Sequence, residues 1–282
     1  MTDKVYVWRK TREADYVNVE TFLRSREIYC VNACSRFITG NFKRGHLWNM
    51  RDAKGNISAL LLHSRRSLLP VYTGNYHAIP HFLDRFLKEI SIHSVQGLRE
   101  DAEILEQGIK DCGYNITDRN DYDIMTLDQN SLPECFKRGP PDLVIRFPNE
   151  ADREELLELH SAYEQEEVIP LGGFFSPENC RKTLAKILFS EQMLVACLGN
   201  RIVGKINTNA KSFTRSQIGG VYVRPEYRKM GIAQKLSAVF AQELIAQGMG
   251  LSLYVKKQNI AARSVYCRLG FVIRGDYRIS YY

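Results

Sequence analysis

The segment 219–233, which reads GGVYVRPEYRKMGIA, constrains the fold of this chain more than any other stretch. A short β-branched run passes through a proline turn and a basic, glycine-containing loop into an amphipathic helix. The apolar stripe of that helix recurs at every fourth position, at Ile232, Leu236, Phe240 and Leu244. The first N–H groups of a helix have no partner within it, and the peptide dipoles leave partial positive charge there. The segment therefore predicts a strand, an anion-binding loop and a helix, in that order.

The loop also carries full positive charge. Arg228 and Lys229 supply it, and Gly231 lets the backbone approach a ligand closely. Residues 216–282 hold ten Lys or Arg against three acidic residues, whereas the rest of the chain is balanced, so the whole formal net charge of +7 lies in this segment. Such a surface raises the local concentration of a polyanionic ligand. Nucleic acid is disfavoured as that ligand, because the sequence has no RNP aromatics, zinc finger or long basic run.

The sequence after the loop predicts two further elements and a closing strand. Gly248 ends the first helix, and the apolar run 251–255 predicts a buried strand. Asn259 is a good N-cap for a second, short helix that ends at Gly270. The unit is therefore strand, loop, helix, strand, helix and strand.

Two motifs in this unit resemble the acyl-CoA-binding core of the GNAT acyltransferase superfamily. In that family an R/Q-x-x-G-x-G/A loop holds the pyrophosphate of CoA, and residues 228–233 match it with alanine in the last place. The family's next element, N-x-x-A-x-x-x-Y-x-x-x-G-F, is met by Asn259, Ala262, Tyr266, Gly270 and Phe271. Two motifs in the right order are far more specific than either alone. The resemblance implies a CoA site formed by Val221, Tyr222, Val223, Arg228, Lys229, Met230, Gly231, Ile232, Ala233, Asn259 and Ala262.

The resemblance also implies the chemistry. In the GNAT pattern the strand at 221–223 splays from its neighbour, and its N–H groups hold the thioester carbonyl as an oxyanion hole does. Tyr266 is the predicted general acid, because a phenol is neutral at pH 7 and can protonate the departing thiolate. A tyrosine on a short helix beside apolar residues also fits a purely structural role in the core. Asn259 has two compatible roles, as a helix cap and as a cofactor partner.

The general base is predicted among acidic residues that border the acceptor site in this superfamily. Glu167 is the first choice and Glu166 the second, since burial can raise the pKa of a carboxyl group toward neutrality. Solvent-exposed acidic residues at the end of a helix would give the same sequence. Lys205, Asn207 and Asn209 alternate on a predicted strand and are expected to face the cleft and orient an acceptor, although a half-exposed strand gives the same pattern.

The chain is long enough for two domains. Residues 143–282 account for a complete catalytic GNAT domain, and residues 1–130 repeat its plan without either motif. We predict a degenerate GNAT-like first domain, with an unrelated α/β domain as the alternative, and a linker at 131–142, where proline, glycine and charge concentrate. The expected fold class is α/β (α+β): two tandem GNAT-like domains, each a mixed, mostly antiparallel twisted sheet flanked by helices.

Composition limits the setting of the protein. No segment approaches the roughly 20 apolar residues that a membrane span needs, and the N-terminus lacks the apolar region of a signal peptide. Seven cysteines are scattered without CxxC pairs, which predicts reduced thiols in a cytoplasmic protein. No metal is expected, because no cysteine or histidine cluster has the spacing of a zinc site.

The predicted function is that of an acyl-CoA N-acyltransferase. It would move an acetyl or other short acyl group from acetyl-CoA, as co-substrate, to a primary amine by direct transfer in a ternary complex. The acceptor would be a small-molecule amine or a peptide or protein N-terminus, and the protein a monomer or homodimer. Two alternatives stay open: a non-catalytic protein that responds to acyl-CoA, and an aminoacyl-tRNA-dependent transferase, although such enzymes typically lack an intact CoA loop.

Overall fold

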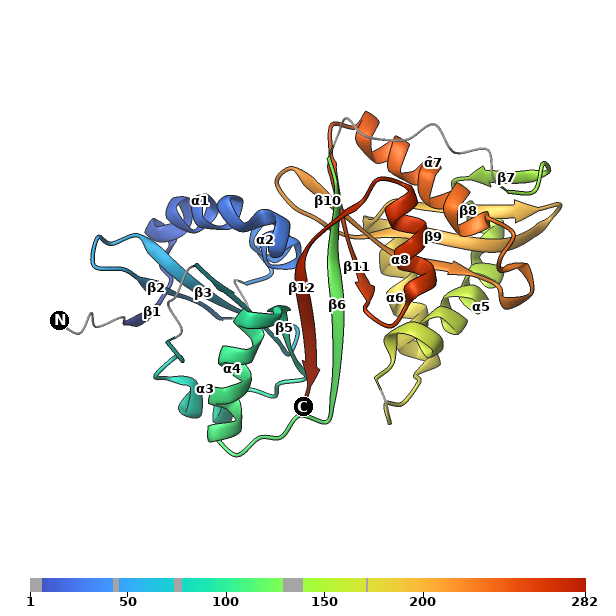
Figure 1. Ribbon diagram of the computed structural model, residues 1–282. Helices are drawn as coiled ribbons and strands as arrows, with labels where there is room; N and C mark the ends of the chain where they lie inside the picture. Colours follow the sequence, from blue (N-terminus) through green and yellow to red (C-terminus); the bar gives the residue numbers. More distant parts are fainter. Residues whose placement is uncertain (1–6, 43–45, 74–77, 129–138, 171) are drawn as a thin grey trace. The chain divides into compact units, whose positions relative to one another are not determined.

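The computed structural model describes residues 7–42, 46–73, 78–128, 139–170 and 172–282, and they fall into two compact units (Figure 1). Unit 1 comprises residues 1–124 and 274–282, and unit 2 comprises residues 125–273. Both are α/β, with a mixed, mostly antiparallel sheet flanked by helices, which confirms the predicted fold class. Within the described ranges, no helix has the length and apolar character needed to cross a membrane.

Unit 1 is built on strands that pair mostly with their sequence neighbours. β1–β2, β2–β3 and β3–β4 are antiparallel, and β4–β5 is parallel. An aromatic cluster that includes Trp8, Trp48, Tyr72 and Phe86 lies in its core. The elements are β1 (Trp8–Lys10), α1 (Tyr16–Arg26), α2 (Val31–Ile38), β2 (His46–Arg51), β3 (Ile57–Ser64), β4 (Ser67–Tyr72), α3 (Leu83–Glu89), β5 (Ser94–Leu98) and α4 (Arg99–Asp111).

Unit 2 follows the same order of elements. β7–β8, β8–β9 and β9–β10 are antiparallel, and β10–β11 is parallel. The elements are β7 (Leu143–Arg146), α5 (Arg153–Tyr163), α6 (Pro177–Ser190), β8 (Met193–Leu198), β9 (Arg201–Lys211), β10 (Arg215–Val223), α7 (Ile232–Ala246), β11 (Gly250–Lys256) and α8 (Ile260–Arg268). The parallel pair β4–β5 of unit 1 and the parallel pair β10–β11 of unit 2 stand at corresponding places, in agreement with the predicted internal repeat.

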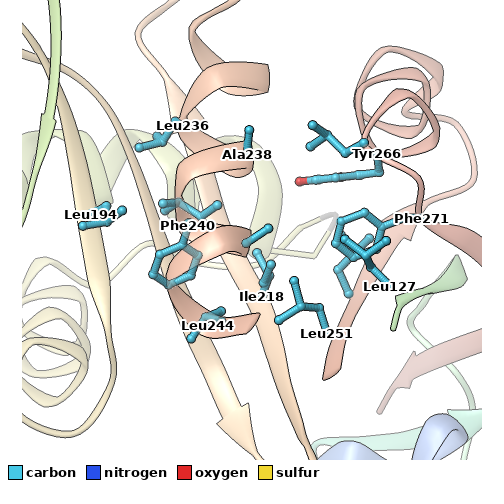
Figure 2. Packing of buried hydrophobic residues seen from close by; sticks show 14 of the residues in the cluster. Leu127, Leu194, Ile218, Leu236, Ala238, Phe240, Leu244, Leu251, Tyr266 and Phe271 are labelled. Carbon is cyan, nitrogen blue, oxygen red and sulfur yellow. The ribbon is translucent and has the colours of Figure 1, made fainter. Parts of the chain in front are cut away.

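Helices cover both faces of the unit 2 sheet because its central strands alternate two apolar sets. On β8, Leu194 belongs to the cluster around α7, whereas Met193 and Val195 pack with α5 and α6. The predicted stripe of α7 is buried as expected. Figure 2 shows Leu236, Phe240 and Leu244 of α7 gathered with Leu194, Ile218 and Leu251 of the sheet.

The final strand of each repeat contributes residues to the other unit. β6 (Asp118–Leu127) begins in unit 1, but the side chains of Met125 and Leu127 are buried in the core of unit 2. β12 (Val272–Tyr281) begins in unit 2, and its residues Tyr277–Tyr281 pair with β5 in unit 1. The linker predicted at 131–142 lies mostly outside the described residues, so a boundary there stays a prediction.

Removing the side chain of Leu127 tests this exchange. Leu127→Ala is expected to lower the free energy of unfolding by about 2–5 kcal/mol, because the side chain is only 1% exposed and leaves a cavity. Val144→Ala on β7 is the control, since Val144 is exposed and its truncation should cost less than about 0.5 kcal/mol. Equal midpoints of urea unfolding for the two variants would show that β6 does not complete the unit 2 core.

Candidate active site

The parallel strands β10 and β11 of unit 2 separate at their carboxyl ends. β10 and β11 pair from Arg215–Gly250 to Ile218–Leu253, and within the described residues the pairing stops there although both strands continue. Opposite this point β10 bulges against β9, with Gly220 at a φ of 58°. The gap leaves one edge of β10 open from the bulge to the end of the strand.

Backbone N–H groups of β10 are directed to that open edge. The N–H of Arg224 bonds to the carbonyl oxygen of Val203 on β9, at 2.9 Å. Because successive N–H groups of a strand point to opposite edges, those of Val221 and Val223 are directed away from β9 and toward the gap. An extended ligand can therefore pair with β10 there as an added strand.

A cavity of about 760 Å³ lies at this gap, within the usual size of small-molecule and cofactor sites. All eleven residues predicted to bind CoA line it, and so do Tyr266, Glu166 and Glu167. They come from β10, the loop before α7, α8 and the segment after α5. The structure thus brings the sequence-predicted site together in one place.

The loop before α7 has the conformation of an anion cradle. Lys229 and Gly231 both have left-handed backbone angles, with φ of 66° and 79°, which turn the chain sharply into the helix. The first bond of the helix runs from the N–H of Lys235 to the carbonyl oxygen of Gly231, at 3.0 Å. The N–H groups of Ile232, Ala233 and Gln234 precede that bond and are directed out of the helix end beside the cavity.

Arg228 braces this loop with its side chain. Its Nε donates to the carbonyl oxygen of Val223 at 3.0 Å, and its guanidinium lies 5.3 Å from the centre of the Tyr222 ring. A second guanidinium nitrogen donates to Glu166 Oε2 at 2.7 Å, and the Tyr222 hydroxyl donates to the same oxygen at 3.1 Å. The Arg228 hydrogen bond holds the pKa of Glu166 below its usual value, against the effect of desolvation. Glu166 is therefore a weak base at neutral pH.

Glu167 and Tyr266 line the same cavity but have different surroundings: Glu167 lies beside a lysine, and the phenol of Tyr266 is buried. Glu167 Oε2 is 3.4 Å from the ammonium of Lys256. Burial raises the pKa of Tyr266 above its ordinary value of 10, with smaller effects from Tyr163 and Glu167, so the phenol stays protonated at neutral pH. Figure 2 shows the Tyr266 hydroxyl pointing from α8 toward α7.

Asn259 is the N-cap of α8, as predicted. Its Oδ1 accepts a hydrogen bond from the N–H of Ala262 at 3.0 Å. The cap holds the start of α8, and the helix in turn carries Tyr266 into the cavity.

Sequence reasoning missed Tyr163 and the turn that follows it. η4 (Glu164–Val168) is a π-helical turn, a form often found at functional sites, and it aims neighbouring acidic residues in different directions. Burial raises the pKa of the Tyr163 hydroxyl to about 12, opposed by a hydrogen bond from the N–H of Gly220. No sequence motif identifies a tyrosine that precedes an acidic run. The contact of Tyr163 with the site is visible only in the structure, where its hydroxyl accepts a hydrogen bond from the N–H of Gly220 at the bulge.

Lys205 and Asn207 differ from expectation. Neither faces the cavity: both are fully buried, and they contact the glycine bulge of β10 instead of an acceptor. Asn209 is exposed on the same strand, and its Oδ1 accepts from Asn207 Nδ2 at 2.9 Å. The three side chains contact one another along one face of β9, and residues of α5, η4 and α6 lie against Lys205 there.

His160, Glu164 and Cys180 are the one group of described residues whose ligand atoms approach closely enough to hold a metal ion, within 4.8 Å of one another. Lys205 lies beside this cluster. Burial lowers the pKa of Lys205, and its interactions with Glu164 and Cys180 oppose that shift. We assign no metal to the cluster.

Comparison with known proteins agrees with this geometry. Residues 152–271 match the model of the Acetyltransferase (GNAT) family. A GCN5-related N-acetyltransferase from Sphaerobacter thermophilus is 17% identical with a TM-score of 0.62, and the match covers 98% of this chain and 95% of that one. No protein of curated function matches the sequence significantly.

Two further solved structures share the fold over nearly the whole chain. A Drosophila protein is 12% identical with a TM-score of 0.65, covering 99% of each chain. A tandem GNAT protein from the clavulanic acid biosynthesis pathway is 10% identical with a TM-score of 0.56, covering 98% of each. The chain thus shares the fold of these proteins over nearly its whole length. Within it, residues 152–271 are similar to the Acetyltransferase (GNAT) family.

Proposed function

We propose that this protein is an N-acetyltransferase that moves an acetyl or short acyl group from acyl-CoA to a primary amine in a ternary complex. One observation carries the proposal. A single cavity combines an open strand edge, a helix N-terminus in an anion-binding loop and a protonated tyrosine. Those three features match the pantetheine arm, the pyrophosphate and the leaving thiolate of acyl-CoA.

The residues divide the binding of CoA between them. The N–H groups that begin α7 would hold the pyrophosphate, together with the ammonium of Lys229. Val221 and Val223 would pair with the pantetheine arm through the open edge of β10. Arg228 acts indirectly, because its guanidinium braces Glu166 and the end of β10.

The chemistry then needs an oxyanion site, an acid and a base. The N–H of Val221 is directed to the gap where the thioester carbonyl would lie, and it would stabilise the negative oxygen of the tetrahedral intermediate. Tyr266 would donate its proton to the departing CoA thiolate. Glu167 is the preferred base for the amine proton, because Glu166 is engaged by Arg228 and Tyr222.

The acceptor we propose is a small-molecule amine or a peptide or protein N-terminus, and we place the protein in the cytoplasm as a monomer or homodimer. The intact phosphate loop argues against an aminoacyl-tRNA-dependent transferase. A non-catalytic acyl-CoA sensor would need the cavity but not the buried acid at Tyr266.

Two measurements test the proposal in sequence. Isothermal titration calorimetry with coenzyme A should give saturable binding in the micromolar to low millimolar range. A panel of amines, including amino sugars, polyamines, amino acids and short peptides, should then be screened for thiol release from acetyl-CoA. Absence of binding at several millimolar coenzyme A would refute the proposed function, and binding without turnover on any acceptor would favour the sensor.

A further inference from the structure

A lysine is buried completely beside the active-site bulge. Lys205 on β9 is 0% exposed, and its Nζ lies 2.9 Å from the carbonyl oxygen of Gly220 and 3.4 Å from Asn207 Oδ1. The ammonium is also 4.3 Å from the centre of the Tyr163 ring. No described carboxylate lies within ion-pair distance of it. A buried charge with no ion-pair partner is costly for stability, so the presence of a lysine here points to a function.

The two polar groups of Gly220 are held from two sides. The hydroxyl of Tyr163 accepts its N–H, and the ammonium of Lys205 donates to its carbonyl oxygen. The φ of 58° suits glycine, and a Cβ at this position would collide with the side chain of Asn207. The peptide group that follows Gly220 therefore has one orientation.

That orientation decides where the next donor points. In a trans peptide the carbonyl group and the following N–H point in opposite directions. Because the carbonyl of Gly220 is directed to Lys205, the N–H of Val221 is directed away from it, consistent with the alternation along β10. A hydrogen bond from an ammonium to the carbonyl also polarises the peptide group and strengthens its N–H as a donor.

We propose that Lys205 is a positioning residue for acyl transfer: it fixes and polarises the Gly220–Val221 peptide so that the N–H of Val221 binds the thioester carbonyl. The inference rests on the proposed function and adds a residue that never touches the substrate. According to this proposal, the buried side chain of Lys205 makes the protein bind acetyl-CoA more tightly than free coenzyme A.

The charge on Lys205 makes this role depend on pH. Burial lowers the pKa of Lys205 to about 7, and Glu164 and Cys180 oppose that shift. The groups that face it are Tyr163 from α5, Glu164 from η4, Cys180 from α6, Asn207 from β9 and the carbonyl of Gly220 from β10. Below about pH 7 the ammonium polarises the peptide, and above it the neutral amine does so more weakly.

Calorimetry with acetyl-CoA and with coenzyme A separates positioning from folding. Wild type should bind acetyl-CoA about fivefold more tightly than coenzyme A at pH 6, the effect of one added hydrogen bond, and less so at pH 8.5. Lys205→Met should bind coenzyme A within about twofold of wild type but show no preference for acetyl-CoA at either pH. Lys211→Met, an exposed change on the same strand, should behave as wild type.

The pH dependence of the free energy of unfolding is a second test, because its direction can be predicted. The pKa of Lys205 in the folded state is about 7, below its ordinary value of 10.5. Between these two pH values the unfolded state binds one more proton than the folded state, so the free energy of unfolding rises with pH across that window. Lys205→Met should lose this rise. A purely structural lysine would make the variant less stable without changing the ratio of the two affinities.

Each outcome decides the matter. Failure of wild type to bind coenzyme A refutes the proposed function itself. Normal coenzyme A binding with an unchanged acetyl preference in Lys205→Met, or with no preference in wild type, refutes only the role of Lys205. If Lys205→Met does not fold, amide NMR of wild type serves instead: the Val221 N–H signal should shift with a midpoint near pH 7, and a pH-independent signal overturns the proposal.

Discussion

Replacing Ala233 by Asp should weaken coenzyme A binding at least about 100-fold while slightly stabilising the fold. Ala233 lies in the first turn of α7 and lines the cavity. A carboxylate there would repel a diphosphate at short range, where two unit charges near a protein surface interact by about 4 kcal/mol. The same carboxylate interacts favourably with the helix dipole and should add about 0.3–1 kcal/mol to stability. Calorimetry with coenzyme A and urea unfolding measure the two effects.

The matched control is Ala233→Asn, which has the size of Asp without the charge. It should weaken coenzyme A binding less than about tenfold, since only steric crowding remains. If the Asp variant binds coenzyme A as tightly as wild type, the diphosphate does not lie at the N-terminus of α7. The proposed function would then lose the feature on which it depends most.

The loop before α7 was predictable from sequence because its signals are local. A helix start, a left-handed turn and a basic run are encoded by adjacent residues, and Gly231 and the stripe of α7 fall where the sequence placed them. The N-cap at Asn259 is local in the same sense. Each of these features depends on backbone conformation within one or two turns, which residue type largely determines.

The environment of the bulge was not predictable in the same way. Lys205 and Asn207 look like alternating residues of a half-exposed strand, and what buries them is tertiary contact with Gly220 and with residues of α5, η4 and α6. The register shift beside Gly220 arises from contacts between strands, which a single sequence does not display. The π-helical turn after Tyr163 is hidden for a related reason, since its residues form an ordinary acidic helical run.

The exchange of the final strands β6 and β12 was also not predictable from the sequence, because it too depends on long-range contacts. The repeat was recognisable from the order of predicted strands and helices. The destination of β6 was not, because an apolar strand end such as Met125–Leu127 fits either core. Long-range pairing decides which sheet a closing strand joins.

Replacing Tyr266 by Phe should lower kcat about 100- to 10,000-fold, the usual contribution of a positioned general acid. The change removes one hydroxyl and keeps the ring, so packing against Phe271 should persist and coenzyme A affinity should stay within about threefold. Because burial raises the pKa of Tyr266 above 10, the wild-type acid stays protonated, so loss of the phenol proton should contribute no fall in turnover between about pH 7 and 9. Steady-state kinetics with acetyl-CoA and an acceptor found by thiol release measure both effects.

Tyr227→Phe provides the comparison, because Tyr227 lines the same cavity but its ring packs against the guanidinium of Arg201. Loss of its hydroxyl should leave kcat within about threefold of wild type. A Tyr266→Phe variant that turns over at the wild-type rate would show that water protonates the thiolate and that Tyr266 serves the core alone. A variant that instead loses coenzyme A affinity would place the hydroxyl in binding, because an acid used only in the transition state changes kcat without changing the affinity for the free coenzyme.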